Sequence, residues 1–202
     1  MPRFAAAIVA IICWAGLAVQ FSATYGVQHD ALQTLWILAR FFTILTNLAL
    51  AVAMTWLATG GRLSASTLGG LTLAILLVGT VYALLLQDLY HLSCAALIAD
   101  ILLHNVSPIA MAVYWLLFAP RARLKWSAPL WWCLYPILYL AYALGRGQLD
   151  GHYPYPFIDV GRIGWLQAAL NAGGIALAFI LCGLALVWID SWRPLGPKRA
   201  SG

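Results

Sequence analysis

The 202-residue chain has few charged residues and no glutamate at all. Charged side chains make up 8% of the sequence, whereas about 25% is usual for a soluble domain. Hydrophobic residues make up 64%, so polar groups are too scarce to cover a water-soluble globule. This composition excludes a soluble enzyme or binding domain and indicates a protein that lies within a membrane.

Cysteine is also scarce, and the four cysteines lack the spacing of a metal or redox site. No two of them form a C-x-x-C pair, and each falls in a different predicted membrane span. We therefore expect small buried side chains, with no disulfide, no metal centre and no cofactor. The four are Cys13, Cys94, Cys133 and Cys182.

Long polar connections are absent too, because six apolar stretches of roughly 20 residues occupy most of the chain. We predict an all-α polytopic membrane protein, a bundle of six transmembrane helices in a single domain over residues 1–202. The first stretch could instead be a cleaved signal peptide, although its apolar run continues through Phe21. The predicted spans lie near residues 4–25, 33–58, 69–87, 92–119, 127–144 and 161–190.

Basic residues in short connections predict orientation, because they are enriched on the cytoplasmic side. Eight lie at the chain ends and in the second and fourth connections, whereas only Arg146 and Arg162 lie in the fifth. We therefore expect both termini in the cytoplasm. The net charge of +5 reports this topology and does not indicate nucleic acid binding. The eight are Arg3, Arg62, Arg121, Arg123, Lys125, Arg193, Lys198 and Arg199.

The second predicted span carries polar groups where a membrane helix ordinarily has none. Arg40, Thr43 and Asn47 are spaced i, i+3 and i+7, so a continuous helix would carry them on one face. Thr46 would lie at the edge of that face. At about 1.5 Å per residue, the three would lie roughly 10–21 Å below the outer end of the span. A cation at that depth requires a partner.

The fourth predicted span supplies a possible partner. Asp100, His104 and Ser107 share one face of that span at a similar depth. Because Arg40 is the only deep cation and Asp100 the only deep carboxylate, we expect these two side chains to pair. That pairing would place Thr43 beside His104. Two amides of the sixth span, Gln167 and Asn171, are expected at a comparable depth.

Three interpretations of this polar cluster remain open. A structural clasp would fix helix register through hydrogen bonds between helices. A proton or substrate pathway would also use buried aspartate and histidine, although the sequence shows neither inverted repeats nor a broken helix pair. The third is catalysis, because a hydroxyl beside a histidine is the nucleophile–base pair of acyl transfer and burial keeps the imidazole neutral.

Three segments of the chain resemble one family of bacterial membrane proteins with six spans. The segments are RFFTILTNLALAV, DILLHNVSPIAMAVYW and YPILYLAYALGRGQLDGHYPYPFIDV. This family is distantly similar to the animal androgen-induced and androgen-dependent TFPI-regulating membrane proteins, and the resemblance covers nearly the whole chain. The animal proteins are intramembrane hydrolases of fatty acid esters of hydroxy fatty acids, and they use a threonine nucleophile with a histidine.

The resemblance implies that this chain hydrolyses a lipid ester with Thr43 as nucleophile and His104 as base. In the animal proteins the threonine follows a basic residue and two apolar residues, a pattern that falls here on RFFT and selects Thr43 rather than Thr46. The polar run after His104 reads NVS where the animal proteins have threonines, and the spacing to Pro108 differs by one residue.

Other polar residues of the cluster are expected to support this chemistry. Asp100 could orient the imidazole of His104 or neutralise Arg40, and the sequence does not separate these roles. The oxyanion could be stabilised by Asn47, Asn105 or the Arg40 guanidinium. The supporting residues are Arg40, Asn47, Asp100, Asn105, Ser107 and Asn171.

The outer connections carry a second set of polar residues, for which solvated turns are the simpler interpretation. The alternative is the mouth of a lipid cavity, formed by Asp88, His91, Arg146 and His152. A metal ion held by His91, His152 and Asp150 is disfavoured, because no ligand spacing supports it. The expected partners are membrane lipids and a lipid ester. The alternative function is a non-enzymatic membrane carrier or scaffold with a buried polar cluster.

The longest outer connection, GRGQLDGHYPYPFIDVG, is rich in glycine and proline, which predicts ordered turns. Tyr153, Tyr155 and Phe157 alternate there with prolines. We expect these aromatic residues to form an interfacial cap over the bundle.

Overall fold

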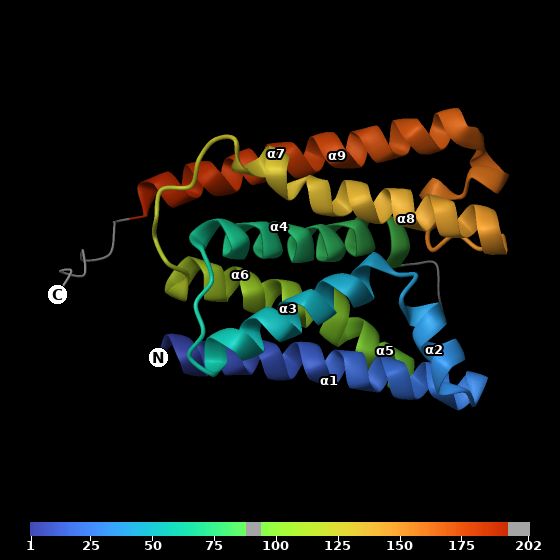
Figure 1. Cartoon of the computed structure of the whole chain (residues 1–202), viewed down its shortest axis with the longest axis horizontal. Coiled ribbons are helices and arrows are strands. Elements are labelled where there is room, and N and C mark those ends of the chain that lie inside the picture. The colour runs from blue at the N-terminus through green and yellow to red at the C-terminus, as the bar shows by residue number, and fades with distance from the viewer. Residues whose placement is uncertain (88–93, 194–202) are drawn as a thin grey trace.

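The computed structural model describes residues 1–87 and 94–193, and within these ranges every regular element is a helix. The predicted all-α fold is therefore confirmed (Figure 1). The helices are α1 (Pro2–Gln28), α2 (Ala31–Leu38), α3 (Phe42–Ala58), α4 (Ala65–Val81), α5 (Cys94–Ile101), α6 (Ser107–Phe118), α7 (Ala128–Trp132), α8 (Leu134–Asp150) and α9 (Val160–Trp192). Short π-helical turns follow α4 (Tyr82–Leu86) and α5 (Leu102–Val106), and a 3₁₀ turn (Pro156–Ile158) precedes α9.

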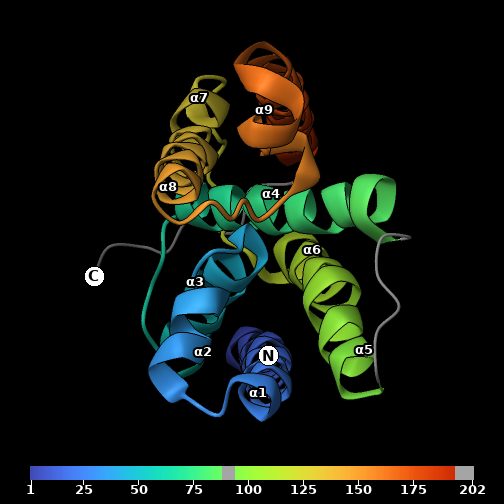
Figure 2. The ribbon, with the colours of Figure 1, turned by 90° about the vertical axis from the view of Figure 1, so that its right-hand side faces the viewer.

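Helix α4 lies at the centre of the molecule. Figure 2 shows α1, α2, α3, α5 and α6 on one side of it and α7, α8 and α9 on the other. Leu68 and Ile75 of α4 are fully buried between these two groups. The apolar interior is therefore continuous from α1 to α9, and α4 contacts helices of both groups.

The described helices have the length and composition of a multi-pass membrane protein. Five continuous helical stretches are long and apolar enough to cross a bilayer, and the bent pair α2–α3 would make a sixth span. The five are Pro2–Gln28, Ala65–Leu86, Ala96–Phe118, Ala128–Asp150 and Val160–Trp192. Large apolar side chains such as Leu138, Leu166 and Leu170 are largely exposed, as expected for surfaces that face lipid. Helix α1 begins and α9 ends at the same end of the molecule (Figure 1). The six crossings and the cytoplasmic termini stay predictions.

The second predicted span is broken, which the sequence analysis did not anticipate. Helices α2 and α3 meet at an angle of 98° across residues 39–41. Arg40 therefore lies in the break and does not share a helix face with Thr43 and Asn47. Helix α3 begins inside the bundle, short of the ends of α1, α8 and α9 (Figure 1). The sequence showed no sign of a broken helix, and for the second span that interpretation is wrong.

The fifth span extends further than predicted. Helix α8 continues to Asp150 and ends at Gly151, whose φ of 71° is a left-handed conformation that glycine adopts without strain. Arg146 is therefore part of this helix rather than of the following connection. After the connection, the Asp159 side chain caps α9 by accepting from the Gly161 and Arg162 N–H groups.

The fourth span contains the π-helical turn Leu102–Val106, which carries His104. Pro108 follows four residues after His104, and a proline ring crowds the carbonyl four residues before it. A wider turn relieves that crowding. The turn also packs closely on α4, since a Cβ atom added at Gly79 would lie 3.0 Å from the His104 carbonyl oxygen.

Candidate active site

The structure places Thr43 and His104 in direct contact. Thr43 is the second residue of α3, is 7% exposed, and its Oγ1 atom lies 3.1 Å from Nε2 of His104. The two residues come from helices on the same side of α4 (Figure 2). The contact expected from the sequence is therefore present. Thr43 meets the geometric requirement for a nucleophile beside a base.

Asp100 holds the other nitrogen of the same imidazole. Its Oδ1 atom lies 2.9 Å from Nδ1 of His104, and its main-chain oxygen lies 3.2 Å from that nitrogen. Because both neighbours of Nδ1 are acceptors, we deduce that Nδ1 carries the proton. Nε2 is then free to accept from the Thr43 hydroxyl. Thr43, His104 and Asp100 thus have the arrangement of a nucleophile, base and orienting carboxylate.

Tyr82 positions both members of the His–Asp pair. Its hydroxyl donates a hydrogen bond to Oδ2 of Asp100. Its ring stacks on His104 with a centroid separation of 4.2 Å and an interplanar angle of 17°. Tyr82 lies in the π-helical turn that follows α4, so α4 as well as α5 sets the orientation of the imidazole.

The expected pair between Arg40 and Asp100 is wrong. Nη2 of Arg40 instead lies 2.7 Å from Oδ2 of Asp150, at the end of α8. Two features explain the difference: the break before α3 turns Arg40 away from the fourth span, and α8 is long enough to reach it. Asp100 is consequently available to His104.

Arg146 belongs to the same ion-pair group as Arg40. Its Nε atom lies 3.5 Å from Asp150, and its guanidinium lies 3.8 Å from the centre of the Trp36 ring. It also donates to the Trp36 main-chain oxygen at 2.5 Å. Arg146 is buried. Arg146 therefore links α2 to α8, and the prediction that it forms part of an open cavity mouth is wrong.

His152 lies beside this group, where its main-chain N–H donates to Oδ1 of Asp150 at 3.0 Å. His152 is exposed and does not line the pocket at Thr43, so its place in an outer mouth stays a prediction. Asp88 and His91, the other residues of that prediction, lie outside the described residues.

Asn47 and Ser107 form a structural clasp between α3 and the fourth span. The Asn47 amide nitrogen donates to the main-chain oxygens of Thr43 and Leu103, at 2.9 and 3.2 Å. Ser107 donates to Oδ1 of Asn47 at 2.6 Å. Both residues are fully buried. Because the Asn47 donors are engaged, Asn47 holds Thr43 and His104 together and is not an oxyanion donor.

The remaining polar residues lie apart from the Thr43–His104 contact. Thr46 is buried and its hydroxyl lies 3.0 Å from that of Tyr135. Asn171 donates to the Phe157 main-chain oxygen at 3.0 Å, so it fixes the connection before α9 instead of joining the cluster. Asn105 is exposed and lies in the π-helical turn next to His104.

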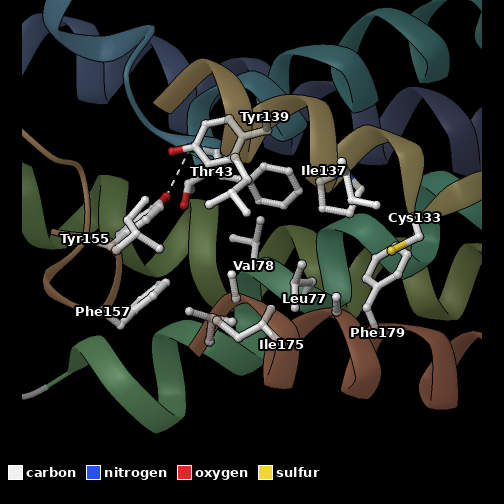
Figure 3. Close-up of a pocket in the computed structure, with 17 residues that line it drawn as sticks. Thr43, Leu77, Val78, Cys133, Ile137, Tyr139, Tyr155, Phe157, Ile175 and Phe179 are labelled. Carbon is white, nitrogen blue, oxygen red and sulfur yellow. Dashed lines mark hydrogen bonds between the residues drawn. The ribbon is translucent and has the colours of Figure 1, made fainter. Parts of the chain in front are cut away.

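An apolar pocket ends at Thr43. Its cavity volume is about 100 Å³, and it lies between α4, α8 and α9. Figure 3 shows Thr43, Tyr139 and Tyr155 at one end and Cys133 and Phe179 at the other. Most of the lining is aliphatic or aromatic, as expected for a site that receives a hydrocarbon chain.

Tyr155 is a site residue that the sequence analysis did not identify. It was expected only as part of an interfacial cap, but its hydroxyl accepts a hydrogen bond from the Phe42 N–H at 3.1 Å. It also interacts with the Thr43 side chain, and the two hydroxyls lie side by side in Figure 3. The YPYPF run is the sequence feature that could have pointed to Tyr155, because alternating prolines fix a rigid turn that can hold an aromatic ring in place.

Burial raises the pKa of Tyr155, which lies in the connection between α8 and α9. Its hydroxyl therefore remains protonated and can donate a hydrogen bond at neutral pH. At the neighbouring N-terminus of α3, the Phe42 N–H donates to the Tyr155 hydroxyl, and the Ile44 and Leu45 N–H groups donate to the Phe41 main-chain oxygen. The Tyr155 O–H is therefore the candidate donor for negative charge that develops beside Thr43.

Of the described cysteines, Cys133 lines the far end of the pocket, whereas Cys13 and Cys182 do not line it. Cys13, Cys133 and Cys182 are free thiols, and Cys182 is exposed rather than buried as expected. Within the described ranges, no group of three or more histidines, cysteines and acidic residues is arranged to hold a metal.

Comparisons with known proteins identify no relative of this chain. The chain matches no family model, no curated protein and no solved structure. The interpretation of the site therefore depends on its geometry and on the sequence segments described above.

Proposed function

We propose that this protein is an intramembrane hydrolase of lipid esters, with Thr43 as nucleophile and His104 as general base. The observation that carries the proposal is the contact chain from Thr43 through His104 to Asp100, located at the end of an apolar pocket. The resemblance to hydrolases of fatty acid esters of hydroxy fatty acids points to the same pair, and such esters are the substrate class we favour.

Acylation begins when Nε2 of His104 takes the proton from the Thr43 hydroxyl as its oxygen attacks the ester carbonyl carbon. Asp100 stabilises the imidazolium that forms, because its carboxylate faces Nδ1 at 2.9 Å. The tetrahedral intermediate then expels the alcohol oxygen, which receives the proton from Nε2. The products of this half-reaction are a free alcohol and an ester of Thr43.

The oxyanion of the tetrahedral intermediate needs donors beside Thr43. The Tyr155 hydroxyl fulfils this role. Its oxygen accepts a hydrogen bond from the Phe42 N–H, which strengthens its own O–H as a donor. This assignment replaces the earlier candidates Asn47 and Arg40, whose donors face other groups.

Deacylation uses the same residues in reverse. A water molecule attacks the acyl carbonyl carbon while His104 accepts one of its protons. The bond to Thr43 breaks, the proton returns from His104 to the threonine oxygen, and a carboxylic acid leaves. The side chains of His104 and Asp100 are 17% and 12% exposed, and we propose that water reaches the acyl group from their side.

We further propose that the protein works in a bacterial inner membrane, with six crossings and both termini in the cytoplasm. The charge asymmetry of the connections and the apolar helices support this location. Membrane lipids then surround the bundle, and a lipid ester can enter sideways without passing through water.

The proposal is tested by ester hydrolysis with purified protein in detergent. Thr43→Val and His104→Ala should each abolish turnover, whereas Thr43→Ser should retain part of it. Thr46→Val is the matched control, because Thr46 lies on the same helix but contacts Tyr135. Equal activity in Thr43→Val and wild type would overturn the proposal.

A carrier or scaffold is the second candidate, and the clasp of Asn47 and Ser107 is the observation that favours it. Such a protein would use the polar residues to fix helix register. It predicts that Asn47→Ala destabilises the bundle while no purified preparation turns over an ester. An active wild type that loses turnover in Thr43→Val excludes this reading.

A further inference from the structure

The pocket beside Thr43 has a defined length. On one side its lining runs from Tyr139 of α8, near Thr43, to Cys133, the residue that precedes α8, at the far end. The six residue steps between them correspond to about 9 Å of helix. Along α9 the lining runs from Ala172 to Phe179, which corresponds to about 10 Å. The two walls therefore give the same depth.

Phe179 closes the far end of the pocket. Its side chain is 2% exposed, and Figure 3 shows it beside Cys133, opposite the end that holds Thr43 and Tyr155. A chain that enters from Thr43 must therefore stop at this ring. The depth of about 10 Å is roughly two-thirds of the 15 Å thickness of one leaflet of the hydrocarbon core, which long acyl chains span.

Small residues on α9 create the width of the pocket. Ala172 and Ala176 line it at consecutive turns, where larger side chains would fill the space between α8 and α9. Ile137 of α8 also lines the pocket and is 49% exposed. The pocket consequently opens sideways, toward the lipid phase, between these two helices.

We infer that this pocket receives the acyl arm of a medium-chain ester, that Phe179 limits the length of that arm, and that Ala172 and Ala176 leave it room. The inference rests on the hydrolase proposed above. The alcohol part of the substrate leaves through the lateral opening near Ile137, because the acyl arm occupies the closed end. Substrate selection is thus a property of α8 and α9, whereas the chemistry belongs to α3 and the fourth span.

The test uses p-nitrophenyl butyrate, octanoate and palmitate with purified protein in detergent. The wild-type kcat/KM should be highest for octanoate. Ala176→Leu should shift the preference toward butyrate, lowering the octanoate-to-butyrate ratio about tenfold. Phe179→Ala should raise the palmitate-to-octanoate ratio by a similar factor. Ala176→Leu keeps the test valid if removal of the buried Phe179 ring prevents folding.

Ala169→Leu is the matched control, because Ala169 lies on the same helix but is exposed and does not line the pocket. Its chain-length profile should equal that of wild type. Butyrate turnover in Ala176→Leu also shows that Thr43 and His104 remain functional in that variant.

The outcomes separate this inference from the proposed function. A wild-type preference for octanoate that moves in opposite directions in the two variants supports the inference. Hydrolysis with a profile that neither Ala176→Leu nor Phe179→Ala alters overturns it and leaves the hydrolase standing. No turnover of any of the three esters by folded wild-type protein overturns the proposed function, and the inference with it.

Discussion

The hydroxyl oxygen of Thr43 lies 3.1 Å from Nε2 of His104, although the two residues are 61 positions apart in the chain. Asn47 maintains this contact by bonding to main-chain oxygens on both sides, those of Thr43 and Leu103. Because a membrane interior offers few competing partners, such a contact between a hydroxyl and an imidazole is well defined. It is the structural basis of the predictions below.

Asp100→Asn should lower kcat/KM by about 10²–10⁴-fold, because an amide can present its N–H to Nδ1 of His104 and favour the wrong tautomer. Steady-state kinetics with a p-nitrophenyl ester measures the effect. Asp30→Asn is the control, since Asp30 only caps α2 and asparagine caps helices equally well. Full activity in Asp100→Asn would contradict the orienting role.

Tyr155→Phe should lower kcat by about 10²–10³-fold with little change in KM, because it removes one oxyanion donor but retains the apolar ring. Tyr153→Phe, in the same connection, should have no such effect, because the Tyr153 hydroxyl accepts from the exposed Gln148 side chain.

A pH profile gives a second test of Tyr155. Since burial raises its pKa, the hydroxyl stays protonated in the folded protein as the pH passes its ordinary pKa of about 10. The donor is therefore present throughout the neutral and mildly alkaline range. Wild-type kcat should show no loss from tyrosinate formation up to and at about pH 10, and a loss centred at or below that value would argue against a buried donor.

Gly79→Leu should reduce activity at least about tenfold while the protein still folds, because any side chain here meets the carbonyl oxygen of His104 and displaces the π-helical turn. Gly173→Leu is the control, because nothing lies within 4 Å of a Cβ atom added there. Circular dichroism and detergent gel filtration report folding, and ester turnover reports the site. Equal activity in the two variants would show that the turn tolerates displacement.

Arg40→Ala should destabilise the protein by roughly 1–3 kcal/mol, because the longer contact to Arg146 is then the one ion pair left to Asp150 among the described residues. Thermal unfolding in detergent measures the loss. The double variant Arg40→Ala/Asp150→Ala should recover part of it, and its kcat should remain within about tenfold of wild type. A complete loss of turnover in a folded double variant would mean that this ion pair belongs to the chemistry.

Much of the fold follows from composition and from the periodicity of apolar residues. The six apolar stretches correspond to the long helices, and both Thr43 and His104 lie in the predicted spans. The break at residues 39–41 could not be predicted, because neither proline nor glycine marks it. The chain bends there through tertiary contacts, including the bonds from Tyr139 and Tyr142 to the main-chain oxygens of Arg40 and Ala39.

The partner of Arg40 shows why the site was only partly predictable. The predicted pair of Arg40 and Asp100 assumed that each span is straight and that the fifth span ends near Leu144. Helix α8 instead carries Asp150 to Arg40, which leaves Asp100 to His104. The spacing of Asp100 and His104 at i and i+4 was visible in the sequence, but the choice between two partners depended on the bend. Tyr155 was missed for a related reason, since a connection that folds back into the bundle has no periodicity.

The most direct test of the account is to locate the nucleophile. Purified protein is labelled with a fluorophosphonate, which forms a bond from phosphorus to the attacking oxygen as fluoride leaves, and peptide mass spectrometry identifies the modified residue. Wild type is compared with Thr43→Ala, His104→Ala and Thr46→Val. The account predicts an adduct on Thr43 that persists in Thr46→Val and is lost in the other two variants. An adduct elsewhere, or labelling of Thr43 that does not require His104, would contradict it.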